Sequence, residues 1–207
     1  MVSTSERSGT LGTTSLPLHM ALSPSYVSAC FITKDATYPR EICERVHAIG
    51  FGELLFLTGC PSPHLKQRLF EQARCPFIYY QDDDCLAPIE QLLAACVPDR
   101  ITCAMKPSHL EAYRERRIAL LGWGTIFPKS VIRVLDRYRA VHGEDALFRR
   151  ESERIMTYLH YPQQRLDLPI VDLPTAFGPD RLSMQPGHYD YIPVVETRCA
   201  KLRSAGL

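Results

Sequence analysis

The sequence lacks the features that mark several classes of protein. None of its eight cysteines forms a C-x-x-C pair, so the usual spacing of zinc ligands is absent. No segment approaches the roughly 18 uninterrupted apolar residues that a membrane span needs. The formal net charge is only +1, from 24 basic and 23 acidic residues, and this balance gives no overall field toward nucleic acid or a membrane. A zinc domain, a membrane-spanning protein and a strongly basic nucleic-acid-binding protein are therefore not expected.

The cysteines are expected to be reduced thiols of the core. Several lie inside apolar runs, such as Cys30 in YVSACFI and Cys103 in ITCAM, where free cysteine behaves as a small buried hydrophobe. This favours free thiols over a disulfide framework and indicates a reducing compartment. Residues 1–24 are rich in Ser and Thr, with no apolar stretch behind Arg7, so they predict a flexible arm rather than a secretory signal. We therefore expect a cytoplasmic protein.

What the sequence does contain is the composition and periodicity of one globular α/β domain over residues 25–207. The chain is 45% apolar and 23% charged, and its length allows one sizeable core. From residue 26 onward, short apolar runs typical of buried parallel strands alternate with helical patterns. This β-α-β-α-β order predicts a Rossmann-like, mostly parallel central sheet with flanking helices in a single compact domain. The expected strands are 26–33, 53–59 and 75–80, and the expected helices are 40–49 and 64–74.

The rest of the chain is expected to continue the alternation less regularly. Its Pro-rich tail, residues 165–196, predicts irregular structure with strand pieces around 168–173. Before this tail, the expected elements are a helix at 89–96, a strand at 100–105, a helix at 109–117, an apolar stretch with glycines at 118–127, and helices at 129–141 and 145–159.

An acidic cluster, Asp82-Asp83-Asp84, directly follows the predicted strand 75–80. In an open parallel α/β sheet, ligands bind outside the carboxyl ends of the strands. Three carboxylates placed there repel one another unless a cation neutralises them, and the alternate pair Asp82 and Asp84 can share one Mg²⁺ or Mn²⁺. Such an ion would bridge the two phosphates of a nucleoside diphosphate leaving group. The alternative interpretation is a solvated acidic turn in which Asp84 caps the following helix.

A second feature is Trp123, which stands between Gly122 and Gly124. Glycines let a backbone pass close to a ligand, and the indole offers a flat apolar face that suits the C–H face of a sugar ring. These three residues are therefore candidates for acceptor binding. The alternative interpretation is a core aromatic residue in a kinked strand.

Two glutamates on the predicted helix 145–159 are candidates for a general base. Glu151 and Glu153 are two positions apart and so point to different faces of a helix, which means that only one can face a cleft shared with Trp123. A carboxylate near the anomeric carbon of a sugar can take the acceptor's proton. The alternative interpretation is a solvated helix surface of mixed charge.

Two further candidates lie in residues 179–191. Arg181 can pair with a diphosphate, and His188, which follows a glycine, can serve as a third metal ligand. A structural role for His188 remains the alternative interpretation.

The order of these motifs resembles that of glycosyltransferases with the nucleotide-diphospho-sugar transferase (GT-A) fold, most of all small glycosyltransferases encoded by bacteriophages. In that family a Rossmann-like half ends in a D-x-D motif, which residues 82–84 match. A glycine-aromatic acceptor segment follows, to which residues 122–124 are similar. An acidic helix motif, E-x-D-R, comes next, where this chain has E-S-E-R at residues 151–154. A late histidine then completes the metal shell, at the place of His188.

The resemblance covers about residues 26–198. It implies that Thr33 and Asp35, at the end of the first strand, contact the nucleobase of the donor. It also implies that residues 25–106 form the half that binds the nucleotide sugar and the metal, and that residues 107–207 form the acceptor half and the tail.

Together these features predict a metal-dependent glycosyltransferase that uses Mn²⁺ or Mg²⁺. The enzyme would move a sugar from a nucleotide-diphosphate sugar, with UDP favoured, to an acceptor hydroxyl with inversion. Donor binding is assigned to Asp82, Asp83 and Arg181 together with the first strand's end. The acceptor stays open between a protein, a modified nucleobase and a glycan, and the oligomeric state is not readable.

Two alternatives of other classes remain. A nucleotidyltransferase would share the sheet and the metal logic, but its glycine-rich signature near the first strand is missing from TKDATYP. A non-catalytic, metal-dependent carbohydrate-binding module would bind sugar without consuming a donor.

Overall fold

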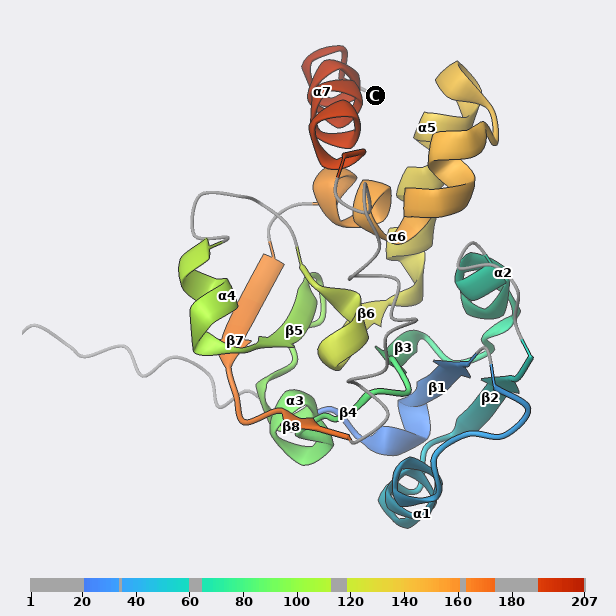
Figure 1. Cartoon of the computed structure of the whole chain (residues 1–207), viewed down its shortest axis with the longest axis vertical. Helices are drawn as coiled ribbons and strands as arrows, with labels where there is room; N and C mark the ends of the chain where they lie inside the picture. Colours follow the sequence, from blue (N-terminus) through green and yellow to red (C-terminus); the bar gives the residue numbers. More distant parts are fainter. Residues whose placement is uncertain are drawn as a thin grey trace, which may run out of the picture.

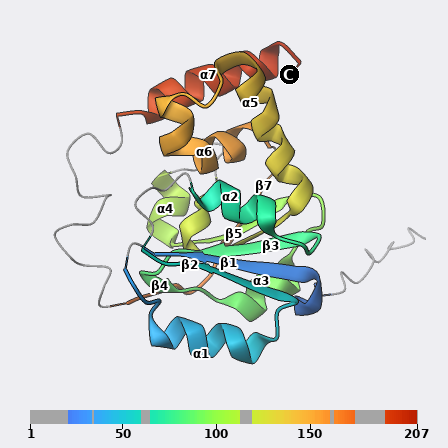
Figure 2. The same cartoon turned by 90° about the vertical axis from the view of Figure 1, so that its right-hand side faces the viewer.

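The computed structural model describes residues 21–33, 35–59, 65–112, 119–160, 163–173 and 190–206. In these residues a mixed, mostly parallel sheet of six strands lies between two layers of helices (Figures 1 and 2), which confirms the predicted α/β class. The strand order is β2-β1-β3-β6-β5-β7. The strands are β1 Val27–Ile32, β2 Glu53–Leu57, β3 Phe77–Gln81, β5 Ile101–Met105, β6 Thr125–Pro128 and β7 Gln163–Asp167.

The sheet contains both parallel and antiparallel pairs of strands. Strand β1 runs parallel to both β2 and β3, and β5 runs parallel to β7. Strand β6 is antiparallel to its neighbours β3 and β5. A separate ribbon pairs β4 Cys85–Leu86 with β8 Val171–Asp172 beside the acidic cluster. The carboxyl ends of β1 and β3 therefore meet at one edge of the sheet.

Alternate residues of the central strand β1 face two separate cores. Cys30 and Ile32 belong to a cluster on the face covered by α2 Leu65–Gln72, α5 Val134–His142, α6 Ala146–Leu159 and α7 Ile192–Ser204. Val27, Ala29 and Phe31 belong to the opposite cluster, under α1 Arg40–Ile49 and α3 Ile89–Ala95. Figure 2 shows these layers edge-on. Burial on both faces explains why this strand reads as a continuous apolar run.

Helix α1 shows how closely local sequence determined the first half of the fold. Its apolar residues Ile42 and Val46 are buried at the predicted helical spacing. The helix ends at Gly50, whose φ of 73° is the left-handed conformation that glycine adopts without strain. The predicted boundaries, 40–49, are those of the structure.

The prediction for the tail was right in one part and wrong in two. Strand β8 lies within the expected strand pieces at 168–173, but β7 and α7 were not expected. Strand β7 lies along the sheet edge beside β5, although its sequence QQRLD carries little of the apolar pattern that marks a buried strand. Helix α7 occupies part of the segment that was expected to be irregular. Its Pro193 stands in the first turn, where proline is tolerated, and apolar residues at helical spacing are buried, namely Ile192, Val195, Cys199 and Leu202.

The second half also differs from prediction in detail. The expected helix 129–141 begins as a 3-10 segment, η3 Lys129–Arg133, before it continues as α5. The apolar stretch with glycines at 118–127 contains η2 Leu121–Trp123 and the start of β6, and α4 covers Pro107–Ala112. Of the predicted arm 1–24, residues 1–20 lie outside the described residues.

Two other expectations concern compartment. Seven described cysteines are free thiols, and five of these are buried. Within the described ranges, no helix is long and apolar enough to cross a membrane.

Candidate functional site

The acidic cluster lies in a turn that is tied to its surroundings on both sides. The backbone N–H of Asp82 donates to the carbonyl of Gly122 at 2.7 Å, and the N–H of Leu173 donates to the carbonyl of Asp84 at 2.9 Å. The turn is thus fixed between η2 and the β4–β8 ribbon. Because it follows β3, the backbone presents its carboxylates at the carboxyl edge of the sheet, as the sequence predicted.

Gly122 allows the carboxylate of Asp82 to lie directly against the backbone. A Cβ atom at residue 122 would stand 1.9 Å from Oδ2 of Asp82, far inside contact distance. Gly124 has a different reason, because its φ is +96° and an added Cβ would stand 2.5 Å from the Cβ of Ala87. The structure therefore gives both glycines an internal packing role, while the acceptor role predicted for residues 122–124 stays a prediction.

Asp82 and Glu153 share one ammonium group. Nζ of Lys66, on α2, lies 3.2 Å from Oδ1 of Asp82 and 3.1 Å from Oε2 of Glu153, on α6. Tyr80 is the last residue but one of β3, and its phenol donates a hydrogen bond to Oδ1 of Asp82. The side chain of Lys66 is only 14% exposed, whereas those of Asp82 and Glu153 are 36% and 35% exposed. Two partly exposed anions thus converge on one largely buried cation.

The protonation states at this point follow from burial and charge. Burial alone would lower the pKa of Lys66, but the charges and hydrogen bonds of Asp82 and Glu153 outweigh it and raise the pKa above its usual range. Burial, followed by the charge of Asp82, raises the pKa of Tyr80 well above its usual value. Lys66 is therefore a cation and Tyr80 a protonated donor at neutral pH.

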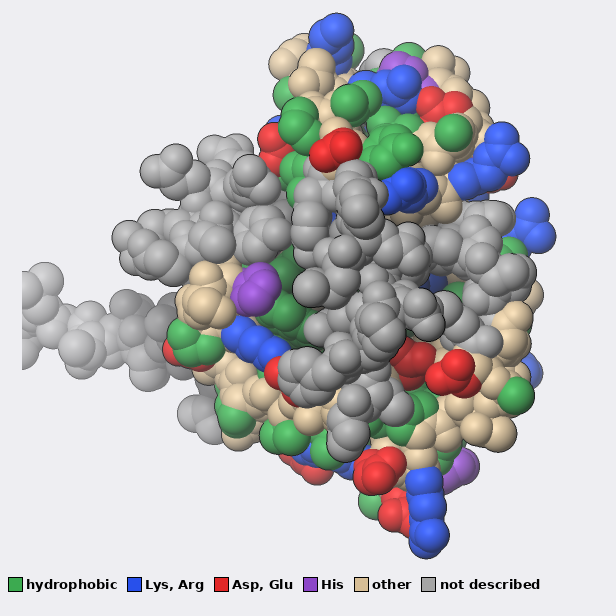
Figure 3. All heavy atoms as spheres, in the orientation of Figure 1, with side chains coloured by type: hydrophobic (Ala, Val, Ile, Leu, Met, Phe, Trp, Pro, Cys, Tyr) green, Lys and Arg blue, Asp and Glu red, His purple; other side chains and the backbone are tan. Residues whose placement is uncertain are grey.

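The end of β1 reaches the same cluster. Thr33 donates its hydroxyl hydrogen to Oδ2 of Asp83, and the backbone N–H of Asp35 donates to Oγ1 of Thr33 at 3.1 Å. The structure thus brings together three residues that were predicted to bind the donor. In Figure 3 acidic side chains are visible beside the carboxyl end of β1.

The two candidate bases have different environments. Glu151 is 6% exposed and lies 3.1 Å from Nε of Arg154 and 3.5 Å from Nε of Arg150. Burial, partly offset by Arg154, raises its pKa. Its backbone, with φ −123° and ψ 21°, interrupts the helical geometry of α6. Glu153 instead reaches Lys66 at the acidic cluster, so the two carboxylates do point to different places.

Trp123 is half-buried beside a polar group that the sequence did not indicate. The ring of His109, on α4, meets the indole edge-on at 4.3 Å, and Nζ of Lys106 lies 5.2 Å from the ring centroid. Lys106 is also ion-paired with Asp172, on β8, at 2.6 Å. Burial and the charge of Lys106 lower the pKa of His109. Figure 3 shows histidine, basic and hydrophobic side chains together beside α4.

The donor set at the cluster fits a hard divalent cation only with help from a substrate. In the described part of the chain, no three histidine, cysteine or carboxylate side chains converge as a metal site. Mg²⁺ and related ions, however, are often held by one or two carboxylates together with substrate phosphates. Asp84 directly precedes Cys85, and burial followed by the charges of Asp84 and Asp82 raises the pKa of the Cys85 thiol. The assignment of Asp82 and Asp84 as metal ligands therefore stays a prediction, in which substrate phosphates complete the shell.

Two predicted site residues, Arg181 and His188, lie outside the described residues. Two residues that sequence reasoning missed are Lys66 and Tyr80. Lys66 appeared only as part of an amphipathic helix, and Tyr80 only as the end of an apolar strand. The single available signal was that Tyr80 stands two residues before Asp82.

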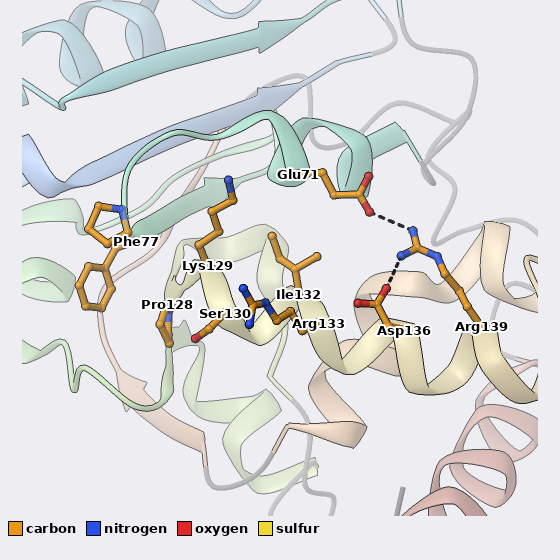
Figure 4. Close-up of a pocket in the computed structure, with 10 residues that line it drawn as sticks. Glu71, Phe77, Pro128, Lys129, Ser130, Ile132, Arg133, Asp136 and Arg139 are labelled. Carbon is orange, nitrogen blue, oxygen red and sulfur yellow. Dashed lines mark hydrogen bonds and ion pairs between the residues drawn. The ribbon is translucent and has the colours of Figure 1, made fainter.

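An open pocket of about 670 Å³ lies elsewhere, against α2, η3 and α5 (Figure 4). It includes Phe77, the first residue of β3, whereas Asp82 follows the last. Three of its charged groups interact with one another, because Arg139 pairs with Glu71 at 2.9 Å and with Asp136 at 2.9 Å. This pocket is therefore at the opposite end of the strand from the acidic cluster.

Comparisons with known proteins add little to this geometry. No family model matches the sequence, and no curated protein matches it. Among solved structures, the chain is similar to glucosyl-3-phosphoglycerate synthase from Mycobacterium tuberculosis in complex with Mn²⁺, uridine diphosphate and phosphoglyceric acid. The identity is 11% and the TM-score 0.40, over 84% of this chain and 78% of that chain. A likeness of this size says nothing about the function of this chain.

Proposed function

We propose that this protein is a glycosyltransferase that uses a nucleotide-diphosphate sugar. The observation that carries the proposal is the meeting of four elements at one sheet edge, namely α2, α6 and the ends of β1 and β3. Lys66 joins Asp82 to Glu153 there, and Thr33 binds Asp83. This contact supports the proposal because Glu153, the proposed base, lies near the carboxylates proposed to hold a metal–diphosphate complex, at the edge where α/β sheets bind nucleotides.

The donor would lie along the ends of β1 and β3. Thr33, Asp35 and Asp83 form a connected polar group for the nucleoside, with UDP as the favoured donor nucleotide. Asp82 and Asp84 would hold Mn²⁺ or Mg²⁺, and His188 and Arg181 are assigned to the metal and the diphosphate. When bound, the ion supplies positive charge that stabilises the departing diphosphate.

Glu153 is the proposed general base. An acceptor hydroxyl oxygen attacks the anomeric carbon, the bond from that carbon to the diphosphate oxygen breaks, and the hydroxyl proton passes to Glu153. Attack from the side opposite the leaving group inverts the configuration. Trp123, whose neighbour Gly122 contacts Asp82, would position the acceptor against its apolar face. Glu151 is less suitable as the base because it is buried between arginines.

Product analysis tests the proposal directly. The protein is incubated with UDP-sugars, Mn²⁺ and candidate acceptors from the three open classes, and the nucleotide product is identified. Free UDP together with a glycosylated acceptor is expected from the wild type and is expected to be lost in Asp84→Asn. Pyrophosphate release would instead indicate nucleotidyl transfer, and sugar binding without any nucleotide product would indicate a binding module. Survival of transfer in a folded Asp84→Asn variant would overturn the metal assignment.

A further inference from the structure

We propose that Lys66 is an internal counter-ion of the donor site, which a divalent cation must displace from Asp82 when it binds. This inference rests on the proposed function, because it assumes that Asp82 is a metal ligand. It adds a positioning residue that keeps two carboxylates together before the metal and the donor arrive.

The occupancy of Oδ1 of Asp82 explains why displacement is needed. A carboxylate oxygen has about two lone-pair directions. In this structure Oδ1 accepts hydrogen bonds from both Lys66 and Tyr80. The other oxygen, Oδ2, lies against the backbone of Gly122. A cation that binds Oδ1 must therefore replace one of its two donors.

Lys66 is the donor that can leave. Tyr80 is completely buried in the sheet, with its ring at an edge-on contact to Phe70. Lys66 carries its ammonium on a flexible four-carbon stem, and it has a second acceptor, Glu153, only 3.1 Å away. Release from Asp82 thus leaves the ammonium group paired rather than isolated.

Lys66 and a divalent cation would compete for Asp82, and the repulsion between their charges makes this competition measurable. A divalent cation on Asp82 would lie within a few ångströms of the ammonium, and like charges at such distances repel strongly even in a partly solvated site. Removing the charge of Lys66 should therefore tighten metal binding, although it removes a stabilising contact from the metal-free protein. If Lys66 had only a structural role, removing its charge would weaken metal binding or leave it unchanged.

The test is a Mn²⁺ titration without nucleotide, with quenching of Trp123 as the readout. Trp123 is the only tryptophan in the chain and is the neighbour of Gly122, which touches Asp82. We expect Lys66→Met to bind Mn²⁺ about tenfold more tightly than the wild type, and Lys66→Arg, which keeps the charge, to stay close to the wild type. The matched control is Lys129→Met, which removes the same charge from a lysine that binds the carbonyl of Ala73.

Each outcome decides a different point. Mn²⁺ binding that is lost in Asp82→Asn but is not tightened in Lys66→Met would overturn the counter-ion role and leave the donor site intact. Equal tightening in Lys129→Met would also overturn it, because the effect would then be one of net charge. Wild-type binding that is absent or insensitive to Asp82→Asn would remove the metal site and the counter-ion role together.

A measurement on the wild type covers the case in which Lys66→Met does not fold. The chain has only five lysines, so ¹³C-methylated amine signals can be assigned from single Lys→Arg variants. Titration with diamagnetic Mg²⁺ should move the Lys66 signal and leave the Lys129 signal in place. A Lys66 signal that stays unchanged while Mg²⁺ binds would overturn the proposal.

Discussion

The two ends of β3 both place a carboxylate beside a basic group, but only one end is balanced. At the amino end, Glu53 accepts hydrogen bonds from Ser28 at 2.7 Å and from the backbone and side chain of Arg74, both at 2.8 Å. The side chain of Glu53 is only 11% exposed. One anion thus meets one cation and a complete set of donors, which is how a buried charge becomes part of a stable fold.

At the carboxyl end, anions outnumber the cation that they share. Asp82 and Glu153 converge on Lys66, and Asp83 and Asp84 lie in the same turn. Both carboxylates that Lys66 holds remain about one-third exposed. Such an excess of negative charge lowers the stability of the protein when no cation is bound, and it favours cation binding. The contact of Glu53 with Arg74 therefore stabilises the fold, whereas the contact of Lys66 with Asp82 and Glu153 lies at the site that we propose binds a ligand.

The largest expected effect is on catalysis at the carboxyl end of β3. Glu153→Gln should lower the rate of sugar transfer by about 10²- to 10⁴-fold, because it removes the carboxylate that we propose as the general base. Glu151→Gln should mainly lower stability, since Glu151 is buried between two arginines. Steady-state kinetics and thermal melting of both variants give the answer. The opposite pattern, with transfer lost only in Glu151→Gln, would exchange their roles.

Alanine substitutions of the two glycines beside Trp123 should have different effects, one on the stability of the fold and the other on nucleotide binding. Gly124→Ala is expected to cost about 2–4 kcal/mol of unfolding free energy, because its φ is positive and its Cβ would meet Ala87 and Leu92 of the core. Gly122→Ala should leave the fold intact, because the group in its way is the carboxylate end of Asp82. It should instead weaken nucleotide–Mn²⁺ binding by displacing that carboxylate. Chemical denaturation and nucleotide titration measure the two effects, and equal destabilisation of both variants would contradict this separation.

At the balanced end, Glu53→Gln should affect stability and its pH dependence alone. Burial works against ionisation of Glu53, but the hydrogen bonds from Ser28 and Arg74 outweigh it and lower its pKa. The contribution of its carboxylate, about 1–2 kcal/mol, is therefore present above the unfolded-state pKa of about 4.3 and is lost as the pH falls through the folded-state value.

Unfolding free energies of the wild type and Glu53→Gln, measured from pH 7 down to pH 3, check this expectation. The difference between the two should be constant near neutrality and should shrink below about pH 4. A difference that grows in acid would show that the sign is wrong. Nucleotide affinity should be the same in both proteins.

The smallest effect is expected in the open pocket of Figure 4. Arg139 pairs there with Glu71 and Asp136, and these partners are 43% and 66% exposed. Exposed ion pairs contribute little, so Arg139→Ala should cost about 1 kcal/mol or less, and less still in high salt. It should leave sugar transfer unchanged. A loss of nucleotide binding in this variant would move the site away from the acidic cluster.

Local sequence was sufficient for the first half of the fold. Apolar spacing and a terminal glycine predicted α1, and apolar runs predicted β1 and β3. Thr33, by contrast, was indicated as a site residue only by the family resemblance. Local sequence was insufficient to predict α7. The preceding segment is rich in proline, and the helical pattern of α7 is evident only from its packing against α5 and α6.

The contact of Lys66 with Glu153 could not be predicted from spacing. These residues are 87 positions apart and lie on helices whose relative placement is decided by the core between them. The sequence likewise offered two glutamates, and only the packing of α6 shows which one reaches α2. Periodicity predicts which face of a helix is buried, but not which distant side chain meets it.

The most direct test of the account compares the two ends in a single binding measurement. Calorimetric titration of UDP with Mn²⁺ is carried out on the wild type, Asp82→Asn and Glu53→Gln. We expect metal-dependent UDP binding that is lost in Asp82→Asn and retained in Glu53→Gln. Equal binding by the wild type and Asp82→Asn, or no binding by a folded wild type to UDP or any other nucleoside diphosphate, would contradict the donor site at the carboxyl end of β3.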